Sequence, residues 1–171
     1  MNTSNQKVTF KGDSVAIGGR ELKIGDSLPA FKLTANDLSD LESTSFDGKA
    51  LIVCSVPSVD TPVCDTEIRK FNEEAANLSD DVVVLVVSQD LPFAQKRWCG
   101  AAGIEKVQTA SDYKYRAFGE DFGVVWQGPQ LLARGVFVSD KEGKLVHVEY
   151  VEDIATEPNY EAALSAAKEV A

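Results

Sequence analysis

Two continuous apolar runs constrain the fold of this chain more than any other feature. Residues 50–56 (ALIVCSV) and 82–88 (VVVLVVS) are rich in β-branched residues and show no polar alternation. Such runs are typical of strands buried on both faces of a parallel sheet. From Ile68 onward, the segment between them repeats apolar residues at spacings of 3, 4 and 3, as one face of an amphipathic helix does. This strand–helix–strand order predicts an α/β fold.

Shorter elements complete the expected order. We predict short hairpin strands at 7–24, a helix at 91–103, a weak strand at 107–110, a helical stretch around 113–122, a hairpin at 134–151 and a helix at 158–170. Parallel strands with crossover helices, extended by an antiparallel pair, predict a thioredoxin-like three-layer sandwich with a mixed central sheet and an N-terminal β-hairpin. No repeat or linker divides the chain, so we expect a single domain over residues 1–171.

Charge and hydropathy exclude several classes of partner. The chain has 17 basic and 27 acidic residues, a formal net charge of −10, which argues against binding to nucleic acid or to an anionic membrane. No apolar stretch approaches the roughly 20 residues of a membrane span. The N-terminal sequence MNTSNQKVTF has no apolar signal-peptide core, so we expect a cytoplasmic protein in a reducing compartment. With His147 as its single histidine, the chain is a poor candidate for a zinc site.

Cys64 is the first candidate for chemistry. It follows the buried strand at 50–56, and the sequence before it predicts a helix start, with Thr61 as the N-cap and Pro62 at the first helical position. Cys64 then lies in the first turn, near unpaired backbone N–H groups and the positive end of the helix dipole. This environment favours a thiolate, the form that attacks a peroxide oxygen. The alternative is a small apolar residue that only packs in the helix.

Cys99 lies 35 residues after Cys64, near the end of the helix predicted at 91–103. Packed helices are roughly 8–10 Å apart, whereas a disulfide needs Cα atoms about 4.4–6.8 Å apart. A bond between the two cysteines would therefore require one or both helical segments to unwind locally. Pro92, Gly100 and Gly103 would make the Cys99 segment short and easily frayed. From spacing alone, a buried helix residue is an equally good interpretation of Cys99.

The remaining candidates have simpler alternatives. Cys54, inside an apolar run, is interpreted as core packing. Arg134 opens a buried-looking strand and needs a partner, which is either a thiolate or an acid in a surface ion pair. His147 is interpreted as an ordinary strand residue, since nothing in the sequence brings it to a cysteine. Four further residues either line a cleft or act as cap and core: Asp90, Pro92, Phe93 and Trp98.

A family resemblance becomes apparent at the segment PSVDTPVC. Pro57, Thr61 and Cys64 match the P-x-x-x-T-x-x-C pattern of peroxiredoxins. The longer segments VPSVDTPVCDTEIRKFN, SQDLPFAQKRWCG and TEPNYEAAL closely resemble the thiol peroxidases, which are atypical two-cysteine peroxiredoxins. The resemblance covers nearly the whole chain.

The resemblance implies a role for each matching residue. Cys64 would be the peroxidatic cysteine and Cys99 the resolving cysteine of the same chain, closing an intramolecular disulfide that thioredoxin reduces. Thr61 would hydrogen-bond the peroxide and the thiolate, Pro57 would shield the sulfur from water, and Arg134 would steady the thiolate and polarise the peroxide. The resemblance also implies a homodimer and an antioxidant peroxidase that needs no cofactor or metal.

Two rival functions and a substrate hypothesis follow from the same residues. A thioredoxin-fold binding or chaperone-like module would consume no peroxide, and a dithiol oxidoreductase usually has a C-x-x-C pair, which this chain lacks. An apolar rim would favour organic hydroperoxides as well as hydrogen peroxide. We expect that rim to consist of Val56, Val59, Phe93 and Trp98.

Overall fold

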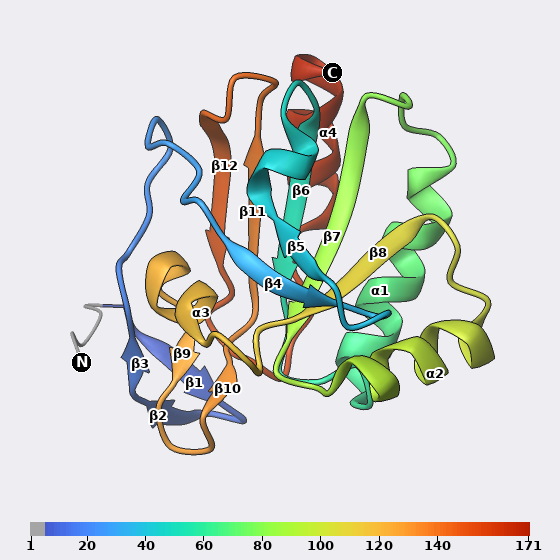
Figure 1. Cartoon of the computed structure of the whole chain (residues 1–171). Helices are drawn as coiled ribbons and strands as arrows, with labels where there is room; N and C mark the ends of the chain where they lie inside the picture. Colours follow the sequence, from blue (N-terminus) through green and yellow to red (C-terminus); the bar gives the residue numbers. More distant parts are fainter. Residues whose placement is uncertain (1–5) are drawn as a thin grey trace.

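A seven-stranded mixed β-sheet forms the centre of the computed structural model, which describes residues 6–171 (Figure 1). From one edge to the other, its strands are β12 (Leu145–Tyr150), β11 (Gly135–Ser139), β6 (Ala50–Ser55), β7 (Val82–Ser88), β8 (Val107–Ser111), β4 (Lys32–Ala35) and β5 (Asp40–Glu42). The two apolar runs are the neighbouring parallel strands β6 and β7, and β8 continues the parallel part. β11 and β4 then pair antiparallel with β6 and β8, so the predicted mixed sheet is confirmed.

Within the described residues, three helices cover one face of the sheet and a fourth lies on the other (Figure 1). The first group is α1 (Pro62–Ala75), α2 (Pro92–Ala102) and α4 (Tyr160–Val170), and the fourth is α3 (Ala117–Phe122). Side chains of β6 alternate between the two apolar cores: Ile52 and Cys54 face the first group, and Leu51 and Val53 face the α3 side. The predicted three-layer, thioredoxin-like sandwich is confirmed.

The N-terminal region contains one local hairpin, followed by a strand with a distant partner. β1 (Val8–Phe10) and β2 (Asp13–Val15) form the predicted β-hairpin. β3 (Ile17–Gly18) does not form a second local hairpin. It pairs with β9 (Val125–Trp126), which also pairs with β10 (Leu131–Leu132).

The glycine after β3 explains why the expected hairpin turn is absent. Gly19 has φ +105°, and a Cβ at this position would lie 2.6 Å from the carbonyl oxygen of Glu120. Gly19 therefore permits a close approach to α3, and the chain does not turn back into a second hairpin within the predicted range 7–24.

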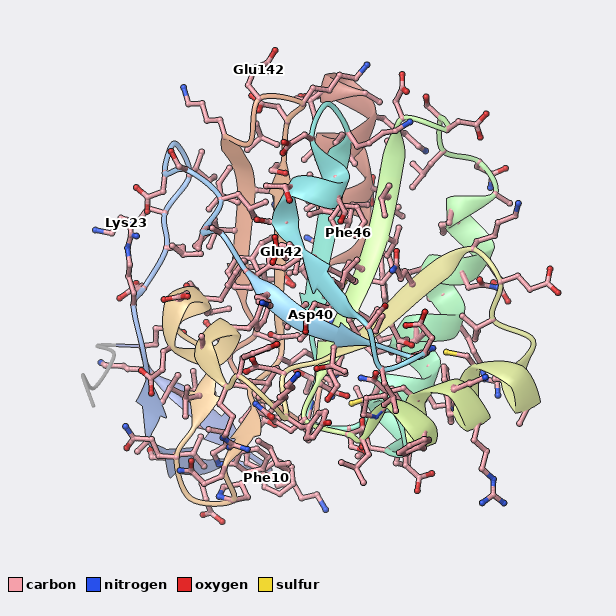
Figure 2. All side chains as sticks on the ribbon, in the orientation of Figure 1. Phe10, Lys23, Asp40, Glu42, Phe46 and Glu142 are labelled. Atoms are coloured by element: carbon pink, nitrogen blue, oxygen red, sulfur yellow. The ribbon has the colours of Figure 1, made fainter. Side chains whose placement is uncertain are left out.

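The sequence pattern also missed the sheet edge formed by β4 and β5. The edge strand β5 is short and polar, and Figure 2 labels its two acids, Asp40 and Glu42. The Lys32 ammonium pairs with Asp40 at 3.2 Å and with Glu42 at 3.7 Å. Charged side chains on an edge strand oppose pairing with another chain. A short 3₁₀ helix, η1 (Ser43–Phe46), connects β5 to β6.

The order of β6 and β7 positions the two cysteine-bearing helices. Because these strands are parallel, α1 and α2 begin at the same end of the sheet, where binding sites of open α/β sheets form. None of the helices within residues 6–171 is long and apolar enough to cross a membrane. The single domain over residues 1–171 stays a prediction, and its first five residues lie outside the described part.

Candidate active site

The first turn of α1 holds Cys64 in a fully buried position. Thr61 is the N-cap in extended conformation, Pro62 occupies the first helical position, and Cys64 follows as the third helical residue, as the sequence predicts. The Cys64 N–H donates to Thr61 Oγ1 over 3.3 Å, and the Thr61 hydroxyl donates to the carbonyl of Ser58 over 3.3 Å. This cap fixes the first turn of α1, which carries the Cys64 sulfur.

The guanidinium of Arg134 contacts that sulfur. Arg134 comes immediately before β11 and is 2% exposed. Its Nη2 donates to Cys64 Sγ over 3.3 Å, its Nε donates to the carbonyl of Ile154 over 3.1 Å, and its Nη1 donates to a carboxylate oxygen of Glu67. The alternative of a surface ion pair for Arg134 is therefore wrong, because its acidic partner is buried as well.

Glu67 completes a buried network of sulfur, guanidinium and carboxylate. It lies one helical turn after Cys64 and is fully buried. Burial raises the pKa of Glu67 to about 7, against the opposing effect of Arg134. Its Oε2 accepts from Arg134, whereas Oε1 has no hydrogen-bond partner in the part of the chain that the structure describes. The charge of this network can therefore change near neutral pH.

The loop between β6 and α1 is fastened by the carboxylate of Asp90. The Asp90 carboxylate accepts from the Ser58 hydroxyl at 2.7 Å, from the Val59 N–H at 2.8 Å and from the Ser88 hydroxyl at 2.6 Å. Pro57, at the start of this loop, is buried. Asp90 thus caps the loop as well as lining the cleft beside it, so both interpretations of this residue apply.

A cleft of about 510 Å³ opens between this loop and α2. Val59 and Trp98 line it, as the predicted apolar rim requires. The other two rim residues were wrongly assigned. Val56 is fully buried in the core, and Phe93 is 65% exposed and does not line the cleft. The complete lining is Ser58, Val59, Asp60, Asp90, Ala94, Arg97, Trp98 and Ala101.

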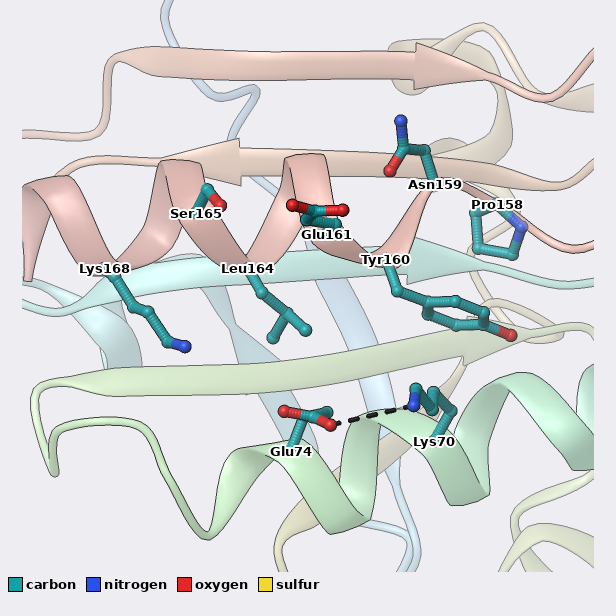
Figure 3. Close-up of a pocket in the computed structure, with 9 residues that line it drawn as sticks. All are labelled: Lys70, Glu74, Pro158, Asn159, Tyr160, Glu161, Leu164, Ser165 and Lys168. Carbon is teal, nitrogen blue, oxygen red and sulfur yellow. Dashed lines mark ion pairs between the residues drawn. The ribbon is translucent and has the colours of Figure 1, made fainter.

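A second groove of about 520 Å³ lies between α1 and α4 (Figure 3). Lys70 and Glu74 of α1 face Tyr160 and Leu164 of α4 across it, and its lining contains no cysteine. The buried sulfur, guanidinium and carboxylate lie outside this groove, so it is not the candidate site.

Cys99 lies on α2 as a half-buried free thiol. Its sulfur is 3.5 Å from the hydroxyl oxygen of Thr109 on β8. Burial raises the pKa of the Cys99 thiol, and the Thr109 contact opposes this effect. Cys64 is also free, so the two thiols occupy separate environments in this structure.

The other two candidate residues lie away from this chemistry. Cys54 is fully buried in the core on β6, which confirms the packing interpretation, and burial raises the pKa of its thiol well above the usual range. His147 pairs with Val138 in the sheet, as an ordinary strand residue does. Within residues 6–171, no group of three or more histidine, cysteine or acidic side chains is placed to hold a metal ion.

Sequence reasoning missed two features, the burial of Glu67 and the contact between Asp65 and Trp98. The apolar spacing that begins at Ile68 extends back by one turn to Cys64, which places Glu67 on the buried face of α1. An acid at a buried helical position is a signal, because a buried carboxylate needs a partner. Asp65 accepts from the indole N–H of Trp98 over 3.1 Å, a contact between two helices that no local pattern indicates.

Comparisons with known proteins identify the family of this chain. The model of the Redoxin family matches residues 23–164. A thiol peroxidase of Bacillus subtilis is 50% identical over 162 residues, covering 95% of this chain and 96% of that protein. A thiol peroxidase of Streptococcus pneumoniae is 50% identical over 161 residues, covering 94% and 98%. The crystal structure of a peroxiredoxin-like protein from Aquifex aeolicus aligns over 100% of both chains, with a TM-score of 0.91 and 41% identity.

Proposed function

The chain belongs to the Redoxin family, and from this premise we propose that it is a thiol-dependent peroxidase in which Cys64 is the peroxidatic cysteine. The observation that carries the assignment is the Arg134 guanidinium, whose Nη2 lies 3.3 Å from the Cys64 sulfur inside a buried site. A fixed positive charge and a helix N-terminus together stabilise a thiolate.

In the first step the Cys64 thiolate attacks the terminal oxygen of a peroxide. A sulfur–oxygen bond forms, the oxygen–oxygen bond breaks, and the second oxygen takes a proton and leaves as water or an alcohol. Arg134 stabilises the negative charge that develops on the leaving oxygen. The product is a sulfenic acid on Cys64, and the protein contributes this chemistry without a cofactor or a metal.

Thr61 and Pro57 shape the place where the peroxide binds. The Thr61 hydroxyl accepts from the Cys64 N–H and donates to Ser58, which leaves one lone pair that can accept from the peroxide O–H. Pro57 is buried beside the cap and excludes water from the sulfur. We take the cleft as the route of approach, and its apolar side chains Val59 and Trp98 support organic hydroperoxides as substrates beside hydrogen peroxide.

In the second step Cys99 acts as the resolving cysteine. It condenses with the sulfenic acid to form an intramolecular Cys64–Cys99 disulfide, which thioredoxin then reduces by thiol exchange. Both thiols are free and each has its own contact, Cys64 with Arg134 and Cys99 with Thr109, so a local movement precedes the bond in this proposal. The three free cysteines suit a reducing compartment such as the cytoplasm, and we place the enzyme there, as the homodimer that the family resemblance implies.

The test is a mass-spectrometric map of the cysteines after the reduced protein receives one equivalent of hydrogen peroxide. We expect Cys64 and Cys99 to be lost together as one disulfide while Cys54 stays free. Cys64→Ser should lose no thiol, and Cys99→Ser should stop at a sulfenic acid on Cys64. Rapid thiol loss that persists in Cys64→Ser would overturn the assignment, and a protein that consumes no peroxide would instead fit a binding module.

A further inference from the structure

Residues next to both cysteines join α1 to α2. Asp65 follows Cys64 in the chain, and Trp98 precedes Cys99. The Trp98 Nε1–H donates to Asp65 Oδ1 over 3.1 Å, so the two helices are tied together one residue away from each sulfur.

Arg69 strengthens this tie at three points. Its Nε donates to Asp65 Oδ2 over 2.9 Å, and its Nη1 donates to the carbonyl of Ala102, near the end of α2, over 3.3 Å. Its guanidinium also lies over the Trp98 ring, 5.8 Å from the ring centroid. We call the side chains of Asp65, Arg69 and Trp98, with the carbonyl of Ala102, the α1–α2 clamp.

A second tether holds the cysteine of α2 itself. Cys99 Sγ lies 3.5 Å from Thr109 Oγ1, and Thr109 is 3% exposed. The same hydroxyl exchanges hydrogen bonds of 3.1 and 3.2 Å with the side-chain amide of Asn36. Because a hydroxyl has one proton, Thr109 accepts from a Cys99 thiol while donating to Asn36, and it can donate to a thiolate instead.

These polar contacts matter because the apolar packing of α2 is partial: Trp98, Cys99 and Ala102 lie partly buried against the core on this face of the sheet. Its fully buried residues are Pro92 and Gln95, and the Gln95 amide donates to the Ser88 hydroxyl and to the carbonyl of Ala110. A segment with few buried apolar contacts opens at low free-energy cost. The clamp and the Thr109 contact therefore add polar restraints to the partial packing that holds the second half of α2 in place.

We propose that the α1–α2 clamp and Thr109 are positioning elements for the resolving step. They hold Cys99 away from Cys64 in the reduced protein, and their release sets how fast the disulfide forms. This inference rests on the proposed peroxidase function.

The step that they control is balanced within the protein. The Cys99 thiolate attacks the sulfur of the Cys64 sulfenic acid, the sulfur–sulfur bond forms, and the sulfur–oxygen bond breaks. The hydroxide that leaves takes up a proton and becomes water. A second peroxide molecule competes for the same sulfenic acid and yields a sulfinic acid. Faster release of α2 thus protects Cys64 from overoxidation.

The experiment times both steps in the full-length reduced chain. The protein is mixed with hydrogen peroxide, quenched with a thiol-alkylating reagent at intervals, and analysed by mass spectrometry for sulfenic acid, disulfide and sulfinic acid. The test variants are Arg69→Met, which removes the centre of the clamp, and Thr109→Val, which removes the second tether. Lys70→Met is the matched control, since Lys70 lies on the same helix with a similar exposure and pairs only with Glu74 there, at 3.7 Å.

We expect Cys64 oxidation to stay within about two-fold of the unchanged protein in all three variants. Loss of the charge-assisted contacts of Arg69, or of the neutral contact between Cys99 and Thr109, should accelerate disulfide formation by about three- to ten-fold. Less sulfinic acid should then form at excess peroxide, and amide hydrogens of α2 should exchange faster. Lys70→Met should change none of these quantities.

Disulfide formation at an unchanged or slower rate in Arg69→Met and Thr109→Val would overturn the inference. If one of them fails to fold, the other decides alone. If Cys64 is not oxidised even in the unchanged protein, the proposed function itself fails and the inference fails with it, so the two failures are distinguishable.

Discussion

The helices α1 and α2 begin alike but are held in different ways. Each follows a parallel strand and starts with a proline at the first helical position. The side chain of Thr61 caps α1, which buries Cys64, Glu67, Ile68 and Phe71. The residue that caps α2 makes no side-chain bond, and that helix fully buries one proline and one glutamine.

The different anchoring of the two helices matches two steps of the proposed reaction, attack on the peroxide by Cys64 and capture of the sulfenic acid by Cys99. Complete burial of an isoleucine or phenylalanine stabilises by about 1.5–3 kcal/mol, so α1 is anchored by side chains that α2 lacks. Attack on a peroxide needs a sulfur held against a fixed charge, which the anchored helix provides. Capture of the sulfenic acid needs a sulfur that can move, which the lightly held helix provides.

The largest expected effect comes from removing the fixed charge beside α1. Arg134→Met should slow the oxidation of Cys64 by about 10²–10³-fold, because the charge on the leaving oxygen loses its stabilising donor. It should also lower the free energy of unfolding by about 1–3 kcal/mol, since the buried Glu67 carboxyl loses its hydrogen-bond partner. Stopped-flow oxidation and urea unfolding measure the two effects.

The double variant Arg134→Met/Glu67→Gln separates these two consequences. It should recover most of the lost stability because no buried carboxylate remains, but it should not recover the oxidation rate. Normal oxidation of Cys64 in either variant would show that the reaction of Cys64 with peroxide does not depend on the Arg134 charge.

A smaller effect is the pH dependence of the free energy of unfolding, which we assign to Glu67 of α1. The pKa of Glu67 is raised from its ordinary value of 4.5 to about 7, mainly by burial. Between these pH values the folded protein binds a proton that the unfolded chain releases. The Glu67 contribution to the free energy of unfolding should therefore fall as pH rises through this window and become constant above it.

Urea unfolding of Glu67→Gln between pH 5 and 8 tests this linkage. Relative to the unchanged protein, the variant should gain stability as pH rises, because glutamine carries no proton to lose. Glu74→Gln changes a partly exposed acid on the same helix and serves as the control, with a pH profile that follows the unchanged protein. A constant stability difference between Glu67→Gln and the unchanged protein would contradict the assignment.

The anchored helix was the easier of the two to predict from the sequence. Its position follows from local signals: a buried strand, Thr61 and Pro62 at a helix start, and Cys64 two residues later. The edge strands β4 and β5 were missed because a short, polar edge lacks the apolar pattern of β6.

The contacts that distinguish the two helices were not predictable from spacing. The Trp98–Asp65 bond and the Cys99–Thr109 contact join residues from separate elements, and only the packing of the fold brings them together. The Arg134–Cys64 contact crosses 70 positions of the chain, so the family resemblance indicated it and periodicity did not.

The smallest expected effects come from substitutions of two glycines in the α2 region, and they test how the stability of α2 controls disulfide formation. Gly103 caps α2 at φ +69°, a left-handed conformation in which alanine costs about 1 kcal/mol, so Gly103→Ala should loosen α2. Gly100 lies inside the helix with open space for a Cβ, so Gly100→Ala should strengthen α2 by up to about 1 kcal/mol.

Rapid-quench kinetics should then show disulfide formation that is a few-fold faster in Gly103→Ala and slower in Gly100→Ala. Cys64 oxidation and the amide exchange of α1 should not change in either variant. Effects of opposite sign from one kind of substitution cannot arise from a general loss of stability. If both variants shift the rate in the same direction, the looseness of α2 does not control the capture of the sulfenic acid.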